Sequence, residues 1–207
     1  MRDLAAVIFD CDGVLFDSRQ ANIKFYNHIL AHFGLPLMTE EDESFVHMQT
    51  ADESVRKIFR STPFTQEAQQ YRKSLDYTPF IHDMVMEPGL NELLKELRSR
   101  FGLAVATNRS HTIGEVLRRH GLEKFFDIVV SSLDVRHPKP HPESLFKILD
   151  FFGIEPFRSV YVGDSKVDYE TAKAAEISFI SFRNDRLDAL FHANCMEDIW
   201  RIIEGKY

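Results

Sequence analysis

The 207-residue chain has only two cysteines, Cys11 and Cys195. Two cysteines are too few for a disulfide framework or a cysteine-based zinc site, and they favour a reducing compartment. No apolar run approaches the roughly 20 residues that a transmembrane helix requires. The apolar run 4–9 follows Arg2 and Asp3 and is too short for a signal peptide. These absences predict a soluble, cytoplasmic protein.

Basic residues are scarce relative to acidic ones. The chain has 25 Lys and Arg against 32 Asp and Glu, which gives a formal charge of −7. Surfaces that bind nucleic acid are normally basic, so this balance argues against such a partner. A phosphorylated ligand remains compatible, because a few local cations can bind it in an acidic protein. Hydrophobic residues make up 44% of the chain, including 18 Phe, which is enough for one globular domain with a modest insert.

Five short apolar runs have the pattern of buried β-strands. They are continuous rather than alternating, which is typical of a parallel sheet covered on both faces. The runs cover 5–9, 102–107, 127–131, 159–163 and 177–182. Helical patterns lie between them from residue 88 onward, at 88–100, 110–121, 141–153 and 165–176. This alternation predicts a doubly wound, Rossmann-like α/β core with five main parallel strands.

Local signals mark the ends of three of these predicted helices. Ser110 is a candidate cap for the second helix, which should stop at Gly121. Pro142 and Gly153 bracket the third helix in the usual order. Ser165 precedes the fourth, where we expect it to cap the helix rather than to bind a ligand.

The segment from Asp17 to about Met84 breaks the alternation. It contains no convincing strand and instead shows helical patterns at about 18–32, 40–48, 52–60 and 65–75. We therefore predict a small all-helical cap inserted after the first strand. The expected domains are an α/β catalytic core, 1–16 and 85–207, and a helical cap, 17–84.

Aspartates follow two of the predicted strands. The stretch FDCDGV places Asp10 and Asp12 after the first strand, and VGDSKVD places Asp164 and Asp168 after the fourth. Ligands of open α/β sheets bind beyond the carboxyl ends of the strands, so we expect these acids to converge. So many carboxylates need a counterion, and Mg²⁺ suits carboxylates that act together with waters and a substrate phosphate. Gly13 permits a sharp departure of the chain from the strand.

Two more strand ends supply groups that can bind phosphate oxygens. Thr107 and Asn108 end the second strand, and Lys139 lies in the proline-rich loop HPKPHPES after the third. Asp10 and Asp12 alternate along an extended segment, so their side chains need not crowd one spot. One carboxylate can then attack phosphorus while the other handles protons.

The stretches DCDGV (10–14), Thr107–Asn108, Lys139–Pro140 and GDSKVD (163–168) resemble the four motifs of the haloacid dehalogenase superfamily. The similarity is greatest to its phosphatases with a small helical cap, the group that contains phosphoglycolate phosphatase and β-phosphoglucomutase. Order, spacing and strand context all fit, and the resemblance covers essentially the whole chain.

The resemblance implies a catalytic role for five residues. Asp10 would be the nucleophile that forms an aspartyl-phosphate, and Asp12 would be the general acid and base. Thr107 and Asn108 would hold the phosphate, and Lys139 would neutralise the charge of the nucleophile and the phosphoryl group. An aspartate at position 12 is similar to phosphatases and mutases, because dehalogenase members lack this acid. Catalysis would then rest on positioning and charge stabilisation.

The resemblance also implies a Mg²⁺ site. Asp10, the backbone carbonyl of Asp12, and Asp164 would be ligands. Asp168 would act through a water or by orienting Lys139.

Substrate choice is assigned by the resemblance to a loop between the second and third cap helices. The matching stretch is 45–54, where His47, Gln49 and Thr50 are the candidates. No arginine or lysine occurs there before Arg56, which argues against phosphoglycolate and leaves small sugar phosphates or other organic phosphates open. Arg109 could reach the substrate across the cap interface, or it could pair with a surface acid.

The functional prediction is a Mg²⁺-dependent phosphatase, similar to phosphoglycolate phosphatase, that hydrolyses a small phosphate monoester. Two alternatives stay open: a phosphomutase of the β-phosphoglucomutase type, and a non-catalytic regulator that binds a phosphate or a partner. We expect a small phosphorylated metabolite as partner, no nucleic acid or membrane, and a monomer or weak dimer.

Two residue types are expected to have no chemical role. Cys11 should be a small core residue rather than a reactive thiol. The nine histidines lack metal-binding spacings such as HExxH, and we expect most of them to be surface or core fillers.

Overall fold

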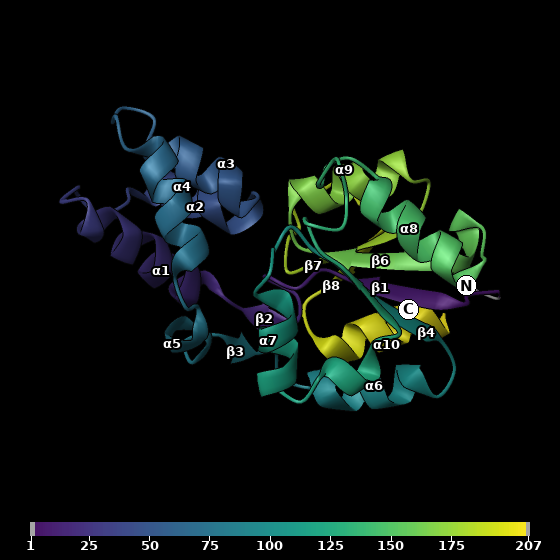
Figure 1. Cartoon of the computed structure of the whole chain (residues 1–207). Helices are drawn as coiled ribbons and strands as arrows, with labels where there is room; N and C mark the ends of the chain where they lie inside the picture. The colour runs from purple at the N-terminus through teal and green to yellow at the C-terminus, as the bar shows by residue number, and fades with distance from the viewer. Residues whose placement is uncertain (1–2, 206–207) are drawn as a thin grey trace. The chain divides into compact units, whose positions relative to one another are not determined.

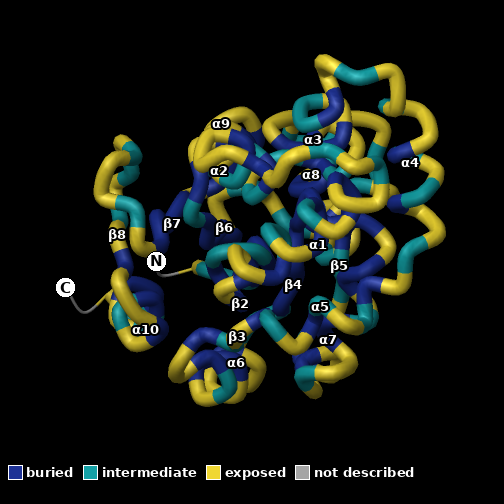
Figure 2. The backbone as a smooth tube through the Cα atoms, turned by 90° about the vertical axis from the view of Figure 1, so that its left-hand side faces the viewer, coloured by how far each residue is buried: buried dark blue, intermediate teal, exposed yellow. Residues whose placement is uncertain are grey.

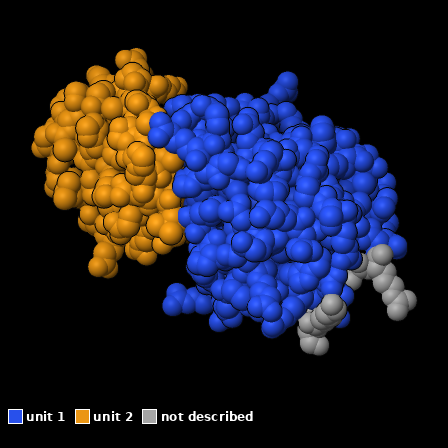
Figure 3. All heavy atoms as spheres, turned by 90° about the horizontal axis from the view of Figure 1, so that it is seen from below, with its two compact units in different colours: residues 1–16, 86–207 blue, residues 17–85 orange. Residues whose placement is uncertain are grey.

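The computed structural model describes residues 3–205. The chain forms two compact units, shown in different colours in Figure 3. One contains the chain up to Phe16 together with the chain from Met86 onward, and the other is Asp17–Val85. Within the described part of the chain, no helix is both long and apolar enough to cross a membrane.

The first unit is built on a six-stranded parallel sheet (Figure 1). The strand order is β5-β4-β1-β6-β7-β8. Their bounds are β1 Ala6–Phe9, β4 Gly102–Ala106, β5 Ile128–Val130, β6 Ser159–Gly163, β7 Ser178–Phe182 and β8 Phe191–Ala193. The five predicted strands are thus confirmed. The sixth, β8, was not predicted, because three residues with a central histidine give too little pattern to identify a strand.

Helices cover both faces of this sheet, with α8 and α9 on one side and α6 and α10 on the other (Figure 1). Their bounds are α6 Leu90–Arg98, α7 Ile113–Arg119, α8 Glu143–Phe152, α9 Lys166–Ala174 and α10 Met196–Glu204, with short 3₁₀ helices at Glu123–Phe125 and Pro156–Arg158. The predicted doubly wound arrangement and its four helices are confirmed. Helix α10 was not predicted, although Met196, Ile199 and Ile203 form a buried apolar face on it.

Burial on both faces explains the continuous apolar runs. All four residues of β1 and all five of β6 are buried, and Figure 2 shows the neighbouring strand β4 largely in the dark blue of buried residues. On one face, Ile8 and Ala104 of the strands pack against Leu145 and Ile148 of α8. A sheet held from both sides leaves its strand ends as fixed points from which polar side chains can project.

Two of the predicted helix caps can be compared with the structure. The cap at Ser110 is wrong: α7 begins at Ile113 after Thr112, and the Ser110 hydroxyl lies 3.3 Å from His111 Nδ1 instead. The cap at Ser165 is confirmed. Its hydroxyl accepts a hydrogen bond from the Asp168 N–H, and the Asp168 carboxylate accepts one from the Ser165 N–H.

The second unit is helical, as predicted. Its helices are α1 Arg19–His32, α2 Glu40–Met48, α3 Ala51–Ile58, α4 Thr65–Ser74 and α5 Thr78–Ile81. The four predicted helices are confirmed, and α5 is an additional single turn. Rings of Phe25, Tyr77 and Phe80 pack edge to face inside this unit, with centroids 5.0 Å and 5.3 Å from Phe25. Two short strands, β2 Phe16–Asp17 and β3 Val85–Met86, pair with each other.

Candidate active site

The carboxyl ends of the central strands bring the predicted acids together. Asp10 directly follows β1, and its N–H donates to the carbonyl of Val162 in β6 (2.9 Å). Parallel register pairs Phe9 with Val162, so Asp10 and Asp164 leave the sheet at the same edge. Asp10, Asp164 and Asp168 each offer a carboxylate oxygen, and these three atoms lie within 4.8 Å of one another. We call these three residues the carboxylate cluster.

Lys139 lies between two members of the carboxylate cluster, Asp10 and Asp168. Its Nζ donates to Asp10 Oδ1 (2.8 Å) and to Asp168 Oδ1 (2.6 Å), with the Tyr161 hydroxyl at 2.9 Å and the Ala106 carbonyl at 3.2 Å. Only 4% of Lys139 is exposed. A buried ammonium is stable only when it is fully paired, and four oxygens meet that requirement here.

The charges of the cluster depend on one another. Burial raises the pKa of Asp10 to about 7, with a further rise from Asp168 that Lys139 partly offsets. Burial, together with Asp168 and Asp10, also raises the pKa of Asp164 well above its usual range. Burial acts the same way on Asp168, but Lys139 and two hydroxyls prevail and lower its pKa. Burial opposes the charge of Lys139, yet the two carboxylates raise its pKa. The positive charge near Asp10 and Asp164 is therefore too small to offset the effect of burial on their carboxylate forms.

Asn108 fixes the backbone that carries Lys139. Its Nδ2 donates to the Lys139 carbonyl (3.1 Å), and its Oδ1 accepts from the Lys139 N–H (3.0 Å). The side chain is thus engaged with the loop, which leaves its backbone N–H as the group that can meet a phosphate. Thr107 is buried at the end of β4, and its Oγ1 accepts from the Arg109 N–H (3.1 Å). This bond leaves the Thr107 hydroxyl proton available for a ligand oxygen.

Arg109 lies against Asp12. Its Nη2 and Nε donate to Asp12 Oδ1 (2.5 Å) and Oδ2 (3.1 Å), and its Nη1 reaches the Thr112 hydroxyl (3.2 Å). Arg109 thus forms an ion pair, but its partner is Asp12, a largely buried acid that follows β1, rather than the surface acid that was one of the two options. Such a bidentate ion pair holds the guanidinium and the carboxylate in one relative orientation. A contact of Arg109 with substrate stays a prediction.

The backbone at Gly13 makes room for Asp164. Gly13 has φ +83°, and a Cβ added there would lie 2.2 Å from Asp164 Oδ2. The position therefore requires glycine for two reasons: the left-handed backbone and the close approach of a carboxylate. Gly13 of the first motif therefore allows Asp164 of the fourth motif to approach the backbone of the first.

We expect Gly13→Ala to lower kcat/KM on the order of a hundredfold, because the new methyl must displace Asp164 by more than an ångström. Gly34→Ala is the matched control. Gly34 also has a positive φ, +66°, but nothing lies within 4 Å of its added Cβ. Steady-state kinetics and thermal unfolding of both variants separate backbone strain from the displacement. Equal activity in the two variants would argue against a role for the Asp164 position.

The donor set of the site fits a hard divalent cation. Counted as ionised, the aspartates after β1 (Asp10 and Asp12), Asp164 after β6 and Asp168 in α9 contribute four negative charges, and Lys139 and Arg109 contribute two positive charges. The resulting formal charge of −2 matches one divalent ion. Each donor is a carboxylate oxygen, the ligand type that Mg²⁺ prefers. Burial is the largest cause of the raised pKa values of Asp10 and Asp164, and a bound cation would lower both by favouring the carboxylate forms.

Tyr161 is a site residue that the sequence analysis missed. It lies within β6, fully buried, and its hydroxyl is 2.7 Å from Asp168 Oδ1. Burial, Asp168 and Asp10 raise its pKa well above the usual range, so it stays a neutral hydrogen-bond donor. A phenol in an otherwise apolar strand (SVYVG) is the signal that could have identified it.

Cys11 is fully buried, and burial raises the pKa of its thiol, which agrees with a core role.

The three cap candidates lie around the junction of α2 and α3. His47 is in the last turn of α2, and its buried Nδ1 has no hydrogen-bond partner among residues 3–205. Gln49 ends α2. Thr50 caps α3: its hydroxyl donates to Glu53 Oε2 (2.7 Å) and accepts from the Glu53 N–H (3.3 Å). The Thr50 hydroxyl is therefore already used to cap α3. A role of His47, Gln49 and Thr50 in substrate binding stays a prediction.

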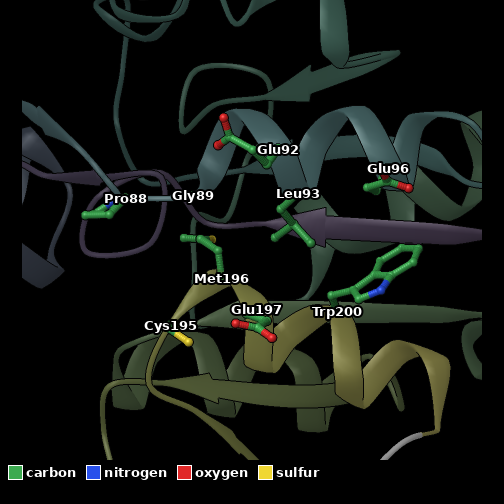
Figure 4. Close-up of a pocket in the computed structure, with 9 residues that line it drawn as sticks. All are labelled: Pro88, Gly89, Glu92, Leu93, Glu96, Cys195, Met196, Glu197 and Trp200. Atoms are coloured by element: carbon green, nitrogen blue, oxygen red, sulfur yellow. The ribbon is translucent and has the colours of Figure 1, made fainter.

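The α/β unit also has a cavity of about 430 Å³ between α6 and α10 (Figure 4). Leu93, Met196 and Trp200 line it together with three glutamates. None of the predicted site residues belongs to its lining. The cavity is therefore distinct from the carboxylate cluster.

Comparison with known proteins supports an enzyme. A family model described as haloacid dehalogenase-like hydrolase matches residues 7–182. A phosphorylated carbohydrates phosphatase of Thermotoga maritima is 32% identical over an alignment of 189 residues that covers 86% of this chain and 84% of that protein. A phosphoglycolate phosphatase of Rhodobacter capsulatus is 29% identical, with 97% of each chain aligned.

A solved structure of the same family has a similar fold. A haloacid dehalogenase superfamily hydrolase of subfamily IA, variant 1, from Geobacter sulfurreducens has a TM-score of 0.85 and 37% identity. The similarity covers 96% of this chain and 99% of that one. The family match spans most of the strands and all four motifs, and the relatives are phosphatases. The chain is thus a phosphoric monoester hydrolase, and it belongs to the haloacid dehalogenase-like hydrolases.

Proposed function

We propose that the chain is a Mg²⁺-dependent phosphatase that hydrolyses a small phosphate monoester through an aspartyl-phosphate on Asp10. The observation that carries this proposal is the carboxylate cluster around Lys139. It joins a nucleophile candidate, a buried cation and an all-oxygen donor set at one edge of the sheet.

In the first half of the reaction, an Asp10 carboxylate oxygen attacks phosphorus and the ester P–O bond breaks. Asp12 gives its proton to the departing oxygen. In the second half, Asp12 takes a proton from water, whose oxygen attacks the phosphorus of the aspartyl-phosphate and regenerates Asp10. Lys139 supplies positive charge beside Asp10 throughout, which favours its ionised form and offsets the charge of the phosphoryl group.

Bound Mg²⁺ would neutralise phosphoryl oxygens and help to orient them. Asp10 and Asp164 are the side chains that we assign to it, with the Asp12 carbonyl. Asp168 is better suited to positioning Lys139, because its Oδ1 already meets Lys139 and Tyr161 while its Oδ2 accepts from Ser165. This favours one of the two roles that the resemblance allows for Asp168.

The ion pair between Arg109 and Asp12 sets a condition on the proton transfer. A guanidinium on both oxygens favours the carboxylate form of Asp12, whereas the acid step needs the protonated form. The pair must therefore open before Asp12 can protonate the leaving group. An incoming phosphate is an alternative partner for Arg109, so substrate entry could free Asp12 at the moment when its proton is needed.

The substrate that we propose is a small phosphorylated metabolite. Two of the relatives described above act, by their names, on phosphorylated carbohydrates and on phosphoglycolate. The α2–α3 junction has no basic side chain among His47, Gln49 and Thr50 beyond the imidazole. That composition suits hydroxyl groups better than a second anionic group, which favours sugar phosphates over phosphoglycolate.

A panel of phosphorylated metabolites, assayed with Mg²⁺ and after chelation, tests this function. We expect release of inorganic phosphate from at least one small ester, reduced at least about tenfold by chelation and restored by Mg²⁺, since the metal stabilises transition-state charge. Conversion of an ester to its isomer without phosphate release would instead indicate a mutase. No turnover of any ester would favour a regulator that binds phosphate or a partner.

A further inference from the structure

A second group of potential metal ligands lies outside the carboxylate cluster. His137, His141 and Glu143 each offer one donor atom, and these atoms lie within 4.8 Å of one another. The rings of His137 and His141 are 4.7 Å apart at their centroids and tilted by 38°. Both histidines are exposed and Glu143 is half-buried, so solvent can deliver an ion to the group.

The backbone fixes the carboxylate of this group. Glu143 Oε1 accepts from the Arg136 N–H (2.9 Å), and Oε2 accepts from the His137 N–H (3.0 Å). These donors keep the pKa of Glu143 below its usual range. His137 Nδ1 lies 3.0 Å from the same Oε2, and His141 Nδ1 lies 3.3 Å from the Glu143 N–H. An ionised oxygen is therefore held beside the two imidazoles before any ion arrives.

We propose that His137, His141 and Glu143 bind a borderline transition-metal ion such as Zn²⁺. Two imidazoles and one carboxylate are ligands that Zn²⁺ accepts, with bonds of about 2.0–2.2 Å. The nitrogen donors separate this site from the carboxylate cluster, whose oxygen-only ligands suit Mg²⁺. Three protein ligands leave one position of a tetrahedral ion for water.

The competing partners of this group are weak. Within the described chain, Glu143 forms an ion pair with His137 alone, which is itself a member of the group. In the carboxylate cluster, by contrast, Lys139 already holds two of the three acids. The exposed imidazoles can rotate, so the donors can approach each other to bonding distance at little cost. A transition-metal ion would displace the shared His137–Glu143 proton and gain both ligands.

A metal ion bound at this site would restrict the motion of the loop that carries Lys139. His137 precedes Lys139 by two residues, His141 follows it by two, and Glu143 begins α8. One ion bound to all three would tie both flanks of Lys139 to the start of that helix. The proposal goes beyond the phosphatase reaction, and metal binding can be measured without any turnover.

Calorimetric titration with Zn²⁺, in excess Mg²⁺ to occupy the carboxylate cluster, tests the proposal. We expect about one Zn²⁺ per chain, bound at least about tenfold more weakly by His137→Ala and by His141→Ala, since each loses a ligand. His82→Ala is the matched control, because His82 is an exposed histidine of the other unit. Glu143→Gln should also bind more weakly, because the amide keeps the size but not the charge.

A second readout identifies the ligands. The electron paramagnetic resonance spectrum of the Cu²⁺-loaded chain should show coupling to nitrogen, and the double variant His137→Ala/His141→Ala should lose it. Circular dichroism of each variant in chelator checks that the fold is kept. Wild-type Zn²⁺ affinity in the double variant, or a Cu²⁺ spectrum with oxygen ligands alone, would overturn the proposal. Failure of the phosphatase assay would leave this result unaffected.

Discussion

Asp10→Asn is expected to lower kcat by at least about a thousandfold while the chain stays folded, the scale of loss that follows removal of a nucleophile. Asparagine has the shape of aspartate but presents a neutral amide that does not attack phosphorus. Folding should persist because Lys139 keeps Asp168, Tyr161 and the Ala106 carbonyl as partners. Removing this buried negative charge also relieves part of the repulsion that, in addition to burial, raises the pKa of Asp164.

The measurement is phosphate release with the best ester of the substrate panel, alongside thermal unfolding. Asp188→Asn, an exposed aspartate of the same unit, is the matched control and should behave as wild type. Labelled phosphate should be trapped on the wild-type chain after rapid acid quenching and should be absent from Asp10→Asn. Activity above about one per cent of wild type in a folded Asp10→Asn variant would count heavily against a covalent route.

The sequence was most informative where local pattern and chemistry coincide. Strands β1 and β6 could be predicted because each is a continuous apolar run that ends in an acid. Once the parallel sheet was predicted, the rule that strand ends share an edge brought Asp10 and Asp164 together. The Ser165 cap was equally local, since its partner lies three residues along the chain. In these cases the deciding contact is either short in sequence or imposed by sheet register.

The rest depended on contacts between distant residues. Nothing near Asn108 indicates that its amide holds the Lys139 backbone, 31 residues away, and Arg109 lies 97 residues from Asp12. The Tyr161 phenol and the group of His137, His141 and Glu143 were missed for a related reason. Tyr161 meets Asp168 because β6 packs beside α9, and His137, His141 and Glu143 meet because their loop folds back on itself. Spacing rules such as HExxH do not describe contacts of this kind. Ser110 failed because the turn before α7 extends two residues further.

Lys139→Met is expected to destabilise the chain by about 3–5 kcal/mol, the cost of leaving buried charge without its partner. Methionine fills the volume of the lysine stem but cannot donate to Asp10 or Asp168, which lie 2.8 Å and 2.6 Å from Nζ. Both carboxylates would remain buried without this counter-charge. Activity should fall together with stability, because the same ammonium supports the charge of Asp10 during phosphoryl transfer.

Denaturant unfolding with chelator and with Mg²⁺ checks both the size and the origin of this effect. If charge is the cause, Mg²⁺ should raise the free energy of unfolding of Lys139→Met by more than that of wild type, because the ion would replace part of the missing positive charge. Lys166→Met is the matched control, since Lys166 is exposed and pairs only with Glu170 at 3.5 Å among the ion pairs of the described chain. A Lys139→Met variant as stable as that control would show that the cluster does not need the ammonium. Equal Mg²⁺ responses in variant and wild type would instead assign the loss to packing, and the carboxylates would then not be the groups that hold the ion.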